Sequence, residues 1–370
     1  MRLDTLRLRG FRNYADLSAA FVPGVNLIVG DNAQGKTNLL EAVTYLSMCR
    51  SFRTRKEQEL IRMGADFAEL EGEAFSGGRA RTIRAVLFPG RRPRQLYLGG
   101  VKQRTAAELA GVLTTVLFCP EDLTALKAGA AARRRLLDHA LCQLRPGYDR
   151  ALREYGRLYE HKSRILKDHF EAPQLLEALP DFNLRMAQVG AVLIAYRARY
   201  MEKLARLTAE FHREFSGGRE VLALQYQTVS TVSDPLAPQE AVLEAILTHQ
   251  QSHARAELES GQCLTGPHKD DFDVTLDGVS LKSYGSQGQV RTAVISLKLA
   301  EREIFRQDTG EAPVLLLDDV LSELDPGRQD FVLNRILSGQ VFITCCERGR
   351  VTAQGKAIAI AHGTIIGEGA

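Results

Sequence analysis

Residues 30–37 read Gly-Asp-Asn-Ala-Gln-Gly-Lys-Thr, which matches the phosphate-loop pattern G-x-x-x-x-G-K-T at each fixed position. The apolar residues 25–29 predict a strand that enters this loop, and the helical spacing of apolar side chains in residues 39–46 predicts a helix that leaves it. In such a loop, backbone N–H groups bind phosphates at the N-terminus of a helix, where the helix dipole favours anions. The context therefore predicts nucleotide binding rather than a glycine-rich turn without a ligand.

The phosphate loop predicts a role for several side chains. Lys36 would reach the β- and γ-phosphates of ATP, and Thr37 would hold Mg²⁺. Arg12 and Asn13 are predicted to lie near the loop by sheet adjacency, and they are candidate nucleotide contacts. The other residues that we expect to contact the nucleotide are Gly30, Asp31, Asn32, Ala33, Gln34 and Gly35.

A second motif, Val-Leu-Leu-Leu-Asp-Asp, occupies residues 314–319. Continuous apolar character suits a central parallel strand that is buried on both faces, and carboxylates at its end lie where ligands bind in open α/β sheets. Asp318 would contact Mg²⁺ through water, and Asp319 would polarise the attacking water. The alternative, a buried strand that ends in solvated acids, is weakened by the phosphate loop.

A third motif, Tyr-Gly-Ser-Gln-Gly-Gln at residues 284–289, precedes a helical pattern in residues 290–305. It resembles the signature of ABC ATPases, which implies that this helix N-terminus faces the γ-phosphate bound to a second subunit. Ser322 and Asp325 resemble the D-loop that crosses the same interface. Taken alone, the motif would be a polar loop that caps a helix. The residues predicted to act on the second subunit are Ser286, Gln287, Gly288 and Gln289.

The order of patterns predicts one α/β domain that is split around a helical insertion. We expect an ABC-ATPase-like head lobe with a phosphate loop and an antiparallel subsheet, formed by residues 1–120 and 260–370. Residues 121–259 form the predicted helical lobe, because apolar side chains recur there at helical spacing. The last predicted strand is residues 341–344.

Composition limits the classes of protein that fit the chain. It has 370 residues with a formal net charge of +3, which is nearly neutral. Its uninterrupted apolar stretches are far too short to span a bilayer, and the N-terminus has neither a signal-peptide nor a transit-peptide pattern. The six cysteines have no metal-binding spacing, so we expect a reduced, cytoplasmic compartment.

The distribution of charge is more informative than its sum. Residues 79–104 contain many arginines and lysines without one acid, and residues 50–56 and 133–135 form further basic clusters. Such clusters suit a phosphate backbone, although cations on strand edges also block aggregation, and the cluster at 133–135 suits a nucleotide or an internal acid equally well. The candidate DNA contacts are Arg53, Arg91, Arg92 and Arg94.

Together these motifs closely resemble the RecF family of bacterial DNA-repair ATPases, which is related to the SMC proteins. The resemblance extends over essentially the whole chain. The segments that carry it are Arg-Gly-Phe-Arg-Asn-Tyr at 9–14, Thr-Asn-Leu-Leu-Glu-Ala at 37–42, Ser-Phe-Arg-Thr at 51–54, Pro-Glu-Asp-Leu at 120–123 with the basic run 133–135 and Asp138, and Thr-Gly-Pro-His-Lys-Asp-Asp at 265–271.

The resemblance implies an ABC-type head lobe with a helical arm and an ATP-dependent homodimer. It implies that the dimer binds duplex and gapped DNA, with slow, DNA-stimulated ATP hydrolysis as a release switch. It further implies a partnership with RecR and RecO in the loading of RecA at single-strand gaps. We therefore expect a cytoplasmic protein, nucleoid-associated when bound to DNA, with no membrane partner.

The sequence also departs from related patterns. Ala-Gly-Ala at 128–130 replaces the usual Gly-Ser-Pro of the family, Glu121 stands where transporters have glutamine, and residues 344–347 offer no histidine as a γ-phosphate sensor. We expect His268 to have a structural role rather than that of a catalytic base. An SMC-like structural ATPase would need a long heptad repeat, and a transporter subunit would need a surface for membrane partners. A nucleotide-gated DNA clamp that does not hydrolyse ATP remains as an alternative.

Overall fold

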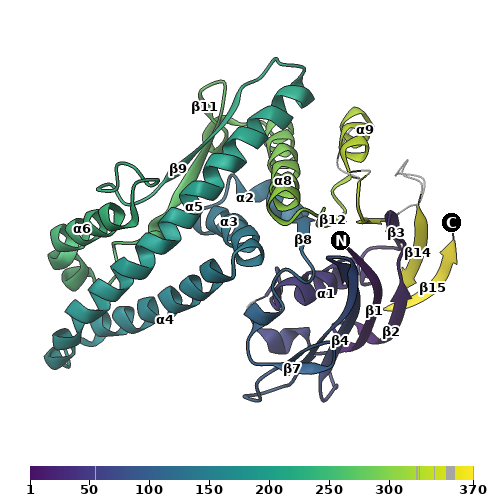
Figure 1. The fold of residues 1–370 in the computed structure, drawn as a ribbon, viewed down its shortest axis with the longest axis horizontal. Coiled ribbons are helices and arrows are strands. Elements are labelled where there is room, and N and C mark those ends of the chain that lie inside the picture. The colour runs from purple at the N-terminus through teal and green to yellow at the C-terminus, as the bar shows by residue number, and fades with distance from the viewer. Residues whose placement is uncertain (55, 322–323, 325, 337, 347–354, 370) are drawn as a thin grey trace. The chain divides into compact units, whose positions relative to one another are not determined.

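The computed structural model describes residues 1–54, 56–321, 324, 326–336, 338–346 and 355–369. The packing divides the chain into two compact units (Figure 1). Unit 1 consists of Met1–Leu123 and Leu297–Ala370, and unit 2 consists of Thr124–Ser296. Ser322, Asp325 and the end of the segment 344–347 lie outside the described residues.

Unit 1 contains a mainly parallel sheet with the strand order β15-β14-β3-β13-β12-β8. The phosphate loop follows β3, and the acidic pair ends β12, whose five residues are all buried. The strands are β3 (Val25–Val29), β8 (Thr115–Phe118), β12 (Val314–Asp318), β13 (Val341–Cys345), β14 (Lys356–Ala361) and β15 (Thr364–Gly369).

Two strands follow the one that we predicted to be the last. β14 pairs in parallel with β3, and β15 returns antiparallel to β14 after a turn at His362 and Gly363. The prediction that residues 341–344 are the final strand is therefore wrong. The missed signal is the alternation of alanine and isoleucine in residues 357–361, which is too short to stand out in a sequence.

The second sheet of unit 1 is antiparallel, as predicted, with the order β2-β1-β4-β5-β6-β7. Helix α1 (Lys36–Met48) packs between the two sheets, because its buried leucines join one hydrophobic core with both (Figure 1). The strands are β1 (Arg2–Phe11), β2 (Tyr14–Ala20), β4 (Ala68–Ser76), β5 (Arg79–Leu87), β6 (Gln95–Leu98) and β7 (Val101–Gln103). The short helices of this unit are η1 (Glu57–Leu60), η2 (Ala106–Glu108) and α9 (Pro326–Arg335).

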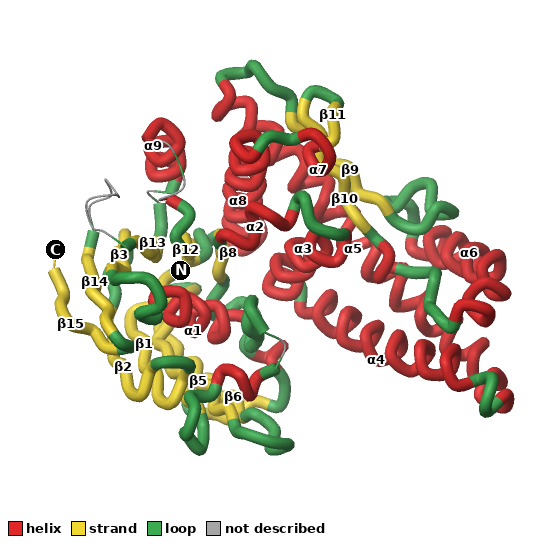
Figure 2. The backbone as a smooth tube through the Cα atoms, turned by 180° about the vertical axis from the view of Figure 1, so that it is seen from behind, coloured by secondary structure: helices red, strands yellow, loops and turns green. Residues whose placement is uncertain are grey.

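Unit 2 is mostly helical, and its helices α4 and α6 both pack on the long helix α5 (Figure 2). Its helices are α3 (Ala130–Leu144), α4 (Pro146–Asp168), η3 (Pro173–Ala178), α5 (Leu179–Ser216), α6 (Gln239–Ser260), η4 (Pro267–Lys269) and α7 (Leu281–Tyr284). Its sheet contains β9 (Leu222–Gln227), β10 (Asp271–Leu276) and β11 (Val279–Ser280). Helices α2 (Pro120–Ala125) and α8 (Gln287–Thr309) each run across a boundary between the units.

The second boundary between the units lies farther along the chain than the sequence pattern predicts. We expected it at residues 259–260, and the packing puts it at residues 296–297. The reason is strand pairing, because β10 pairs with β9 along its whole length. Residues 271–276 therefore pack with the helical part of the chain, and the signature-like segment that follows them belongs to unit 2.

Candidate nucleotide site

The phosphate loop has the backbone shape that its glycines predict. Gly35 caps α1 with φ +118°, and a Cβ at this position would lie 2.6–2.9 Å from the side-chain atoms of Asn13 and Tyr14. At Gly30, a Cβ would lie 2.3 Å from the carbonyl oxygen of Ile360 on β14. Both positions therefore require glycine, because other groups approach the backbone too closely for a Cβ. Position 35 also requires glycine because its φ is left-handed.

The carbonyl groups of this loop are held from behind. Asn13 Nδ2 donates to Gln34 O at 2.9 Å, and the Tyr14 hydroxyl donates to Gly35 O at 2.8 Å. Because C=O and N–H of a trans peptide point in opposite directions, these bonds turn the N–H groups of Gly35 and Lys36 away from β2. Those N–H groups lie at the start of α1, where phosphates bind. Asn13 and Tyr14 thus orient the cradle, and sequence reasoning did not single out Tyr14.

Lys36 folds back over the loop. Its Nζ donates to Gly30 O at 2.6 Å and to Asp31 O at 3.1 Å, and it lies 3.6 Å from Cys346 Sγ at the end of β13. The ammonium group is thus held at the mouth of the cradle, where it would meet phosphates. Cys346 is a neighbour that the motif did not predict.

Arg12, the other predicted neighbour of the loop, is placed differently from Asn13. Its Nε and Nη2 each donate to Glu41 at 2.8 Å, and its Nη1 donates to Glu59 O at 2.8 Å. Three of its nitrogens are therefore bound to α1 and η1. Asn13 contacts the loop directly, whereas Arg12 supports the helix that leaves it.

The acidic pair meets the loop through two threonine hydroxyls. Thr37 Oγ1 and Thr344 Oγ1 both donate to Asp318 Oδ1, at 3.0 and 2.9 Å, and Thr344 Oγ1 accepts the N–H of Asp319 at 2.8 Å. The arrangement follows from strand register, because Asp318 on β12 is the direct neighbour of Thr344 on β13. Asp319 itself has a left-handed φ of 57°, which is uncommon for a residue other than glycine.

Burial sets the electrostatics of this pair. Loss of hydration raises the pKa of Asp318, the hydrogen bonds from Thr344 and Thr37 oppose that rise, and the charges of Asp319 and Glu121 add to it. A bound cation would stabilise the ionised carboxylate and so offset the cost of burying it. The hydroxyl of Thr37 and the carboxylate of Asp318 are hard oxygen donors that suit Mg²⁺, which takes few protein ligands and completes its shell with phosphates and water.

Within the described ranges, no group of three or more His, Cys, Asp or Glu side chains could hold a metal ion. At the position beside Thr37 and Asp318, Mg²⁺ would take its remaining ligands from phosphates and water.

The signature-like segment begins α8 as expected. Ser286 and Gln289 form a reciprocal cap, in which Gln289 N–H donates to Ser286 Oγ at 3.2 Å and Gln289 Oε1 accepts Ser286 N–H at 3.0 Å. Gly285 is held by Lys127, whose Nζ donates to its carbonyl at 2.6 Å. Ser286 and Gln287 are exposed, so this helix N-terminus is open to a ligand or partner.

The segment 265–271 forms a buried polar network in unit 2. Arg197 pairs with Asp270 at 2.8 Å and with Asp138 at 2.9 Å. His268 Nε2 donates to Cys263 O at 3.0 Å, so Nδ1 of the neutral ring accepts the Tyr155 hydroxyl at 2.8 Å. Burial lowers the pKa of His268 to about 4. A neutral ring with both nitrogens occupied supports the structural role that we expected for His268.

The basic cluster at 133–135 also serves this network. Arg133 makes a bidentate pair with Asp271, with distances of 2.6 and 2.7 Å. Arg134 donates to the carbonyl of Asp270 at 2.6 Å. The internal acid that we kept as one alternative is therefore present for Arg133.

The candidate DNA contacts differ in how free they are. Arg91 and Arg92 are exposed, and the Arg92 guanidinium lies 3.6 Å from the centre of the Phe88 ring. Arg94 instead pairs with Glu57 and donates to Cys49 O at 2.6 Å. Arg94 therefore holds the end of α1 against η1, and it is the candidate least available to a phosphate.

The antiparallel sheet adds acids that the basic segment 79–104 lacks. Register places Glu71 of β4 between Arg7 of β1 and Arg84 of β5. Arg84 also forms an ion pair with Glu69 at 3.1 Å. Arg84 is thus partly neutralised by β4, whereas Arg79 and Arg81 lie opposite Ser76 and Ala74. Arg91 and Arg92 are both exposed on the turn that follows β5.

The strand, phosphate loop and helix, the acidic pair on β12 two positions along the same sheet, and the antiparallel subsheet define a P-loop protein with an ABC-ATPase-like head. The family model described as RecF/RecN/SMC N terminal domain matches residues 2–365. The chain belongs to this family, and within it to the RecF proteins.

Relatives and solved structures agree with this placement. The chain is 36% identical over 351 residues to DNA replication and repair protein RecF of Acetivibrio thermocellus, covering 94% of each chain. It is 40% identical to RecF of Symbiobacterium thermophilum, covering 94% of this chain and 92% of that one. The structure of the recombination mediator protein RecF-ATPrS in the RecFOR pathway superposes with a TM-score of 0.92 at 32% identity, covering 98% of this chain and 97% of that one. An Smc head domain from Pyrococcus furiosus, at 16% identity and a TM-score of 0.56, shares the fold.

In the part of the chain that the structure describes, no helix is both long and apolar enough to cross a bilayer.

Proposed function

We propose that this protein binds ATP with Mg²⁺ and uses ATP to control binding to DNA during recombinational repair and replication restart. The observation that carries the proposal is the contact of Thr37, Asp318 and Thr344 around one carboxylate oxygen beside a pre-oriented phosphate cradle. A relative in the same family has been solved as RecF-ATP, with 32% identity and a TM-score of 0.92.

The side chains around the cradle divide the chemistry of ATP hydrolysis. Lys36 would place its ammonium against the β- and γ-phosphates, and Thr37 and Asp318 would hold Mg²⁺, which neutralises phosphate charge when bound. Asp319, whose backbone N–H is fixed by Thr344, would orient the attacking water.

The proposed cycle needs a second copy of the chain. The exposed cap formed by Ser286 and Gln289, together with Gln287 and Gly288, would meet the γ-phosphate bound to the partner. ATP would then join two chains into a homodimer that binds duplex DNA and gap junctions, and slow hydrolysis would release it. RecR and RecO are the proposed protein partners, acting with this protein to load RecA, because the relatives carry the RecF name and the RecFOR pathway is named in the structures.

Analytical ultracentrifugation with ATP, with ADP and with neither tests the shared site. We expect ATP alone to produce a dimer, and we expect Asp319→Asn to make that dimer long-lived because the water is no longer oriented while Asp318 still serves Mg²⁺. Ser286→Arg should abolish the dimer while ATP still binds the monomer. If Asp319→Asn binds ATP and stays monomeric, the shared site is wrong.

Phosphate release separates the proposal from the remaining alternative. A DNA clamp that does not hydrolyse ATP would use the same residues for binding. It would release no phosphate, so Lys36→Arg would leave its phosphate release unaltered. In the proposed ATPase, Lys36→Arg retains ATP binding and loses turnover, because the guanidinium does not fit a site shaped for a compact ammonium. The measurement is phosphate release with and without duplex DNA.

A further inference from the structure

The hairpin of β14 and β15 meets the phosphate loop at its turn, which consists of His362 and Gly363. Both residues have left-handed φ values, 50° and 70°, and the flanking pair is Ala361 with Thr364. Two positive φ values define a two-residue type I′ turn. The N–H groups of the two turn residues lie outside the ladder of the hairpin, so they need other acceptors.

Both N–H groups are donated to one residue of the phosphate loop. His362 N–H donates to Gln34 Oε1 at 2.6 Å, and Gly363 N–H donates to Gln34 O at 3.1 Å. The same hairpin contacts the start of the loop, where the carbonyl oxygen of Ile360 leaves no room for a Cβ at Gly30. The hairpin therefore supports the loop both at its first residue and near its middle.

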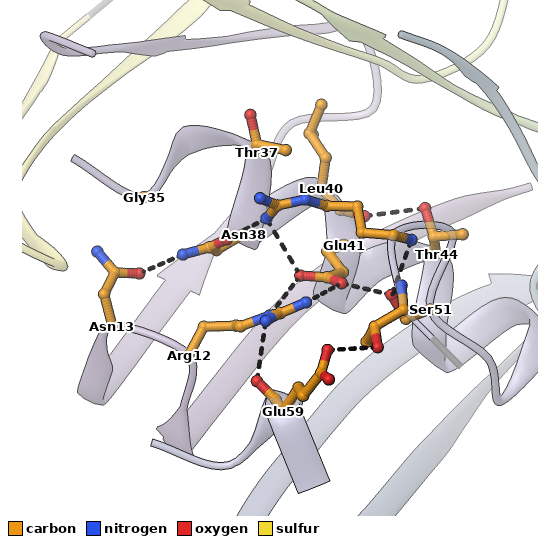
Figure 3. Close-up of polar contacts among 12 residues, drawn as sticks. Arg12, Asn13, Gly35, Thr37, Asn38, Leu40, Glu41, Thr44, Ser51 and Glu59 are labelled. Atoms are coloured by element: carbon orange, nitrogen blue, oxygen red, sulfur yellow. Dashed lines mark hydrogen bonds and ion pairs between the residues drawn. The ribbon is translucent and has the colours of Figure 1, made fainter. Parts of the chain in front are cut away.

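Asn13 joins this contact from the other sheet. Asn38 Nδ2 donates to Asn13 Oδ1 at 2.8 Å (Figure 3), which leaves Asn13 Nδ2 to donate to Gln34 O at 2.9 Å. Gly363 packs so closely here that a Cβ on it would lie 2.5 Å from Asn13 O. The carbonyl of Gln34 thus has two donors, and the closeness of Gly363 depends on its lack of a side chain.

The phosphate loop needs such support at this point. Gln34 lies between Ala33, with φ 63°, and Gly35, with φ 118°. A left-handed φ is unfavourable for alanine, and it persists only where surrounding contacts enforce it. Because the backbone N–H groups of this stretch form the cradle, contacts that fix Gln34 also fix the groups that would bind phosphates.

We propose that the turn of His362 and Gly363 is a positioning element of the nucleotide site, whose two backbone N–H groups hold Gln34 and so tighten ATP binding. The imidazole of His362 is on an exposed residue and takes no part. This inference rests on the proposed function, because it concerns the same ATP site. By linkage, bound ATP holds the turn on Gln34 more firmly by the same factor.

Two substitutions release the turn from opposite sides. Gly363→Ala places a Cβ against Asn13 O in a strained backbone, so the turn must move away from the loop. Gln34→Ala keeps the loop backbone and removes the acceptor of the His362 N–H. We expect each change to raise the dissociation constant of ATP with Mg²⁺ about fivefold, the effect of one hydrogen bond.

A matched control lies in another hairpin of the same unit. Gly99 and Gly100 form a two-residue turn between β6 and β7 with φ values of 57° and 80°. Apart from its chain neighbours, no atom of the described residues lies within 4 Å of a Cβ at Gly100. Gly100→Ala therefore introduces similar backbone strain away from the phosphate loop, and it should leave ATP affinity unchanged.

A second control separates the backbone of the turn from its side chain. His362→Asn keeps the N–H group, and asparagine followed by glycine suits a type I′ turn. ATP affinity should therefore stay at the wild-type value. A loss as large as that of Gly363→Ala would mean that the imidazole acts, and it would overturn the backbone route. Urea unfolding midpoints show whether each variant is folded, and Gln34→Ala decides the matter if Gly363→Ala does not fold.

Hydrogen exchange of the wild-type protein gives a readout that needs no substitution. We expect ATP to slow the exchange of the amides of His362 and Gly363 about fivefold and to leave those of Gly99 and Gly100 unchanged. If the wild type does not bind ATP, the proposed function and this inference fail together. If it binds ATP but exchange at the turn is unaltered, or if Gly363→Ala and Gln34→Ala bind no more weakly than Gly100→Ala, only the inference is overturned.

Discussion

Thr344→Val tests whether the hydroxyl between the two carboxylates organises the nucleotide site. Thr344 is 1% exposed, donates to Asp318 and accepts the backbone N–H of Asp319. Valine has nearly the same shape, so the change removes two hydrogen bonds and leaves little cavity. The bond to a carboxylate contributes about 1.5–3 kcal/mol, and the orphaned N–H costs about 1–3 kcal/mol.

The net loss is smaller than the sum of these ranges. Asp318 keeps the bond from Thr37, Asp319 is only half-buried so that water can reach its N–H, and the new methyl group gains about 0.8 kcal/mol of burial. We therefore expect the free energy of unfolding of the nucleotide-free protein to fall by about 2–4 kcal/mol. Urea denaturation measures it, with Thr344→Ser as the control that keeps the hydroxyl.

Catalysis gives a second readout of the same change. The hydrogen bond from Thr344 lowers the pKa of Asp318 against the effect of burial, so its loss raises that pKa further. More of the protein then has a protonated Asp318, which cannot hold Mg²⁺, at any given pH near that value. The acidic limb of the pH profile for phosphate release should move to higher pH in Thr344→Val and stay in place in Thr344→Ser. A variant with wild-type stability and an unmoved acidic limb would refute the reasoning.

Three further changes test neighbouring features. Asp318→Asn should raise the free energy of unfolding of the nucleotide-free protein at neutral pH. Burial raises the folded pKa of Asp318, so the protonated carboxyl contributes to stability below the unfolded value of about 3.9. That contribution is lost as pH rises through the folded value. Urea unfolding at several pH values checks this, and a gain that persists below about pH 4 would contradict it. Glu41→Gln should lower stability by about 3 kcal/mol because Arg12 loses a buried partner, and unchanged unfolding would mean that water replaces it. Replacing Arg91 and Arg92 by alanine should flatten the salt dependence of DNA binding by roughly one unit per lost contact without changing ATP affinity, whereas an unchanged slope would place the DNA elsewhere.

The sequence predicted the parts of the site whose chemistry is local. Residues 30–37 and 314–319 carry their roles in consecutive side chains, and the strand and helix around each follow from apolar spacing. The structure confirms the strand that precedes the loop and the helix that follows it. The proposed contacts of these residues with ATP and Mg²⁺ stay predictions.

The parts that were missed depend on which strands become neighbours. Thr344 gains its role because β13 lies beside β12 in one register, and Tyr14 gains its role because β2 starts behind the loop. Strand pairing also changes the charge around the basic segment 79–104, because Glu71 faces Arg84 only after β4 and β5 pair. No spacing within a single segment reveals such partners.

Several features of the nucleotide site lower the stability of the nucleotide-free protein. Asp318 is a buried carboxylate with a raised pKa, and Asp319 and Ala33 are non-glycine residues with left-handed φ values of 57° and 63°. Each left-handed residue costs about 1–2 kcal/mol, and these costs persist only where surrounding bonds such as those of Thr344 enforce them. A ligand that supplies a cation to Asp318 removes the cost of the buried carboxylate. The phosphates of the same ligand bind the cradle, whose shape requires the left-handed residues. Mg²⁺ with ATP should therefore stabilise the folded chain beyond ATP with a chelator, and the difference should shrink in Asp318→Asn, because that variant no longer has a buried charge to neutralise.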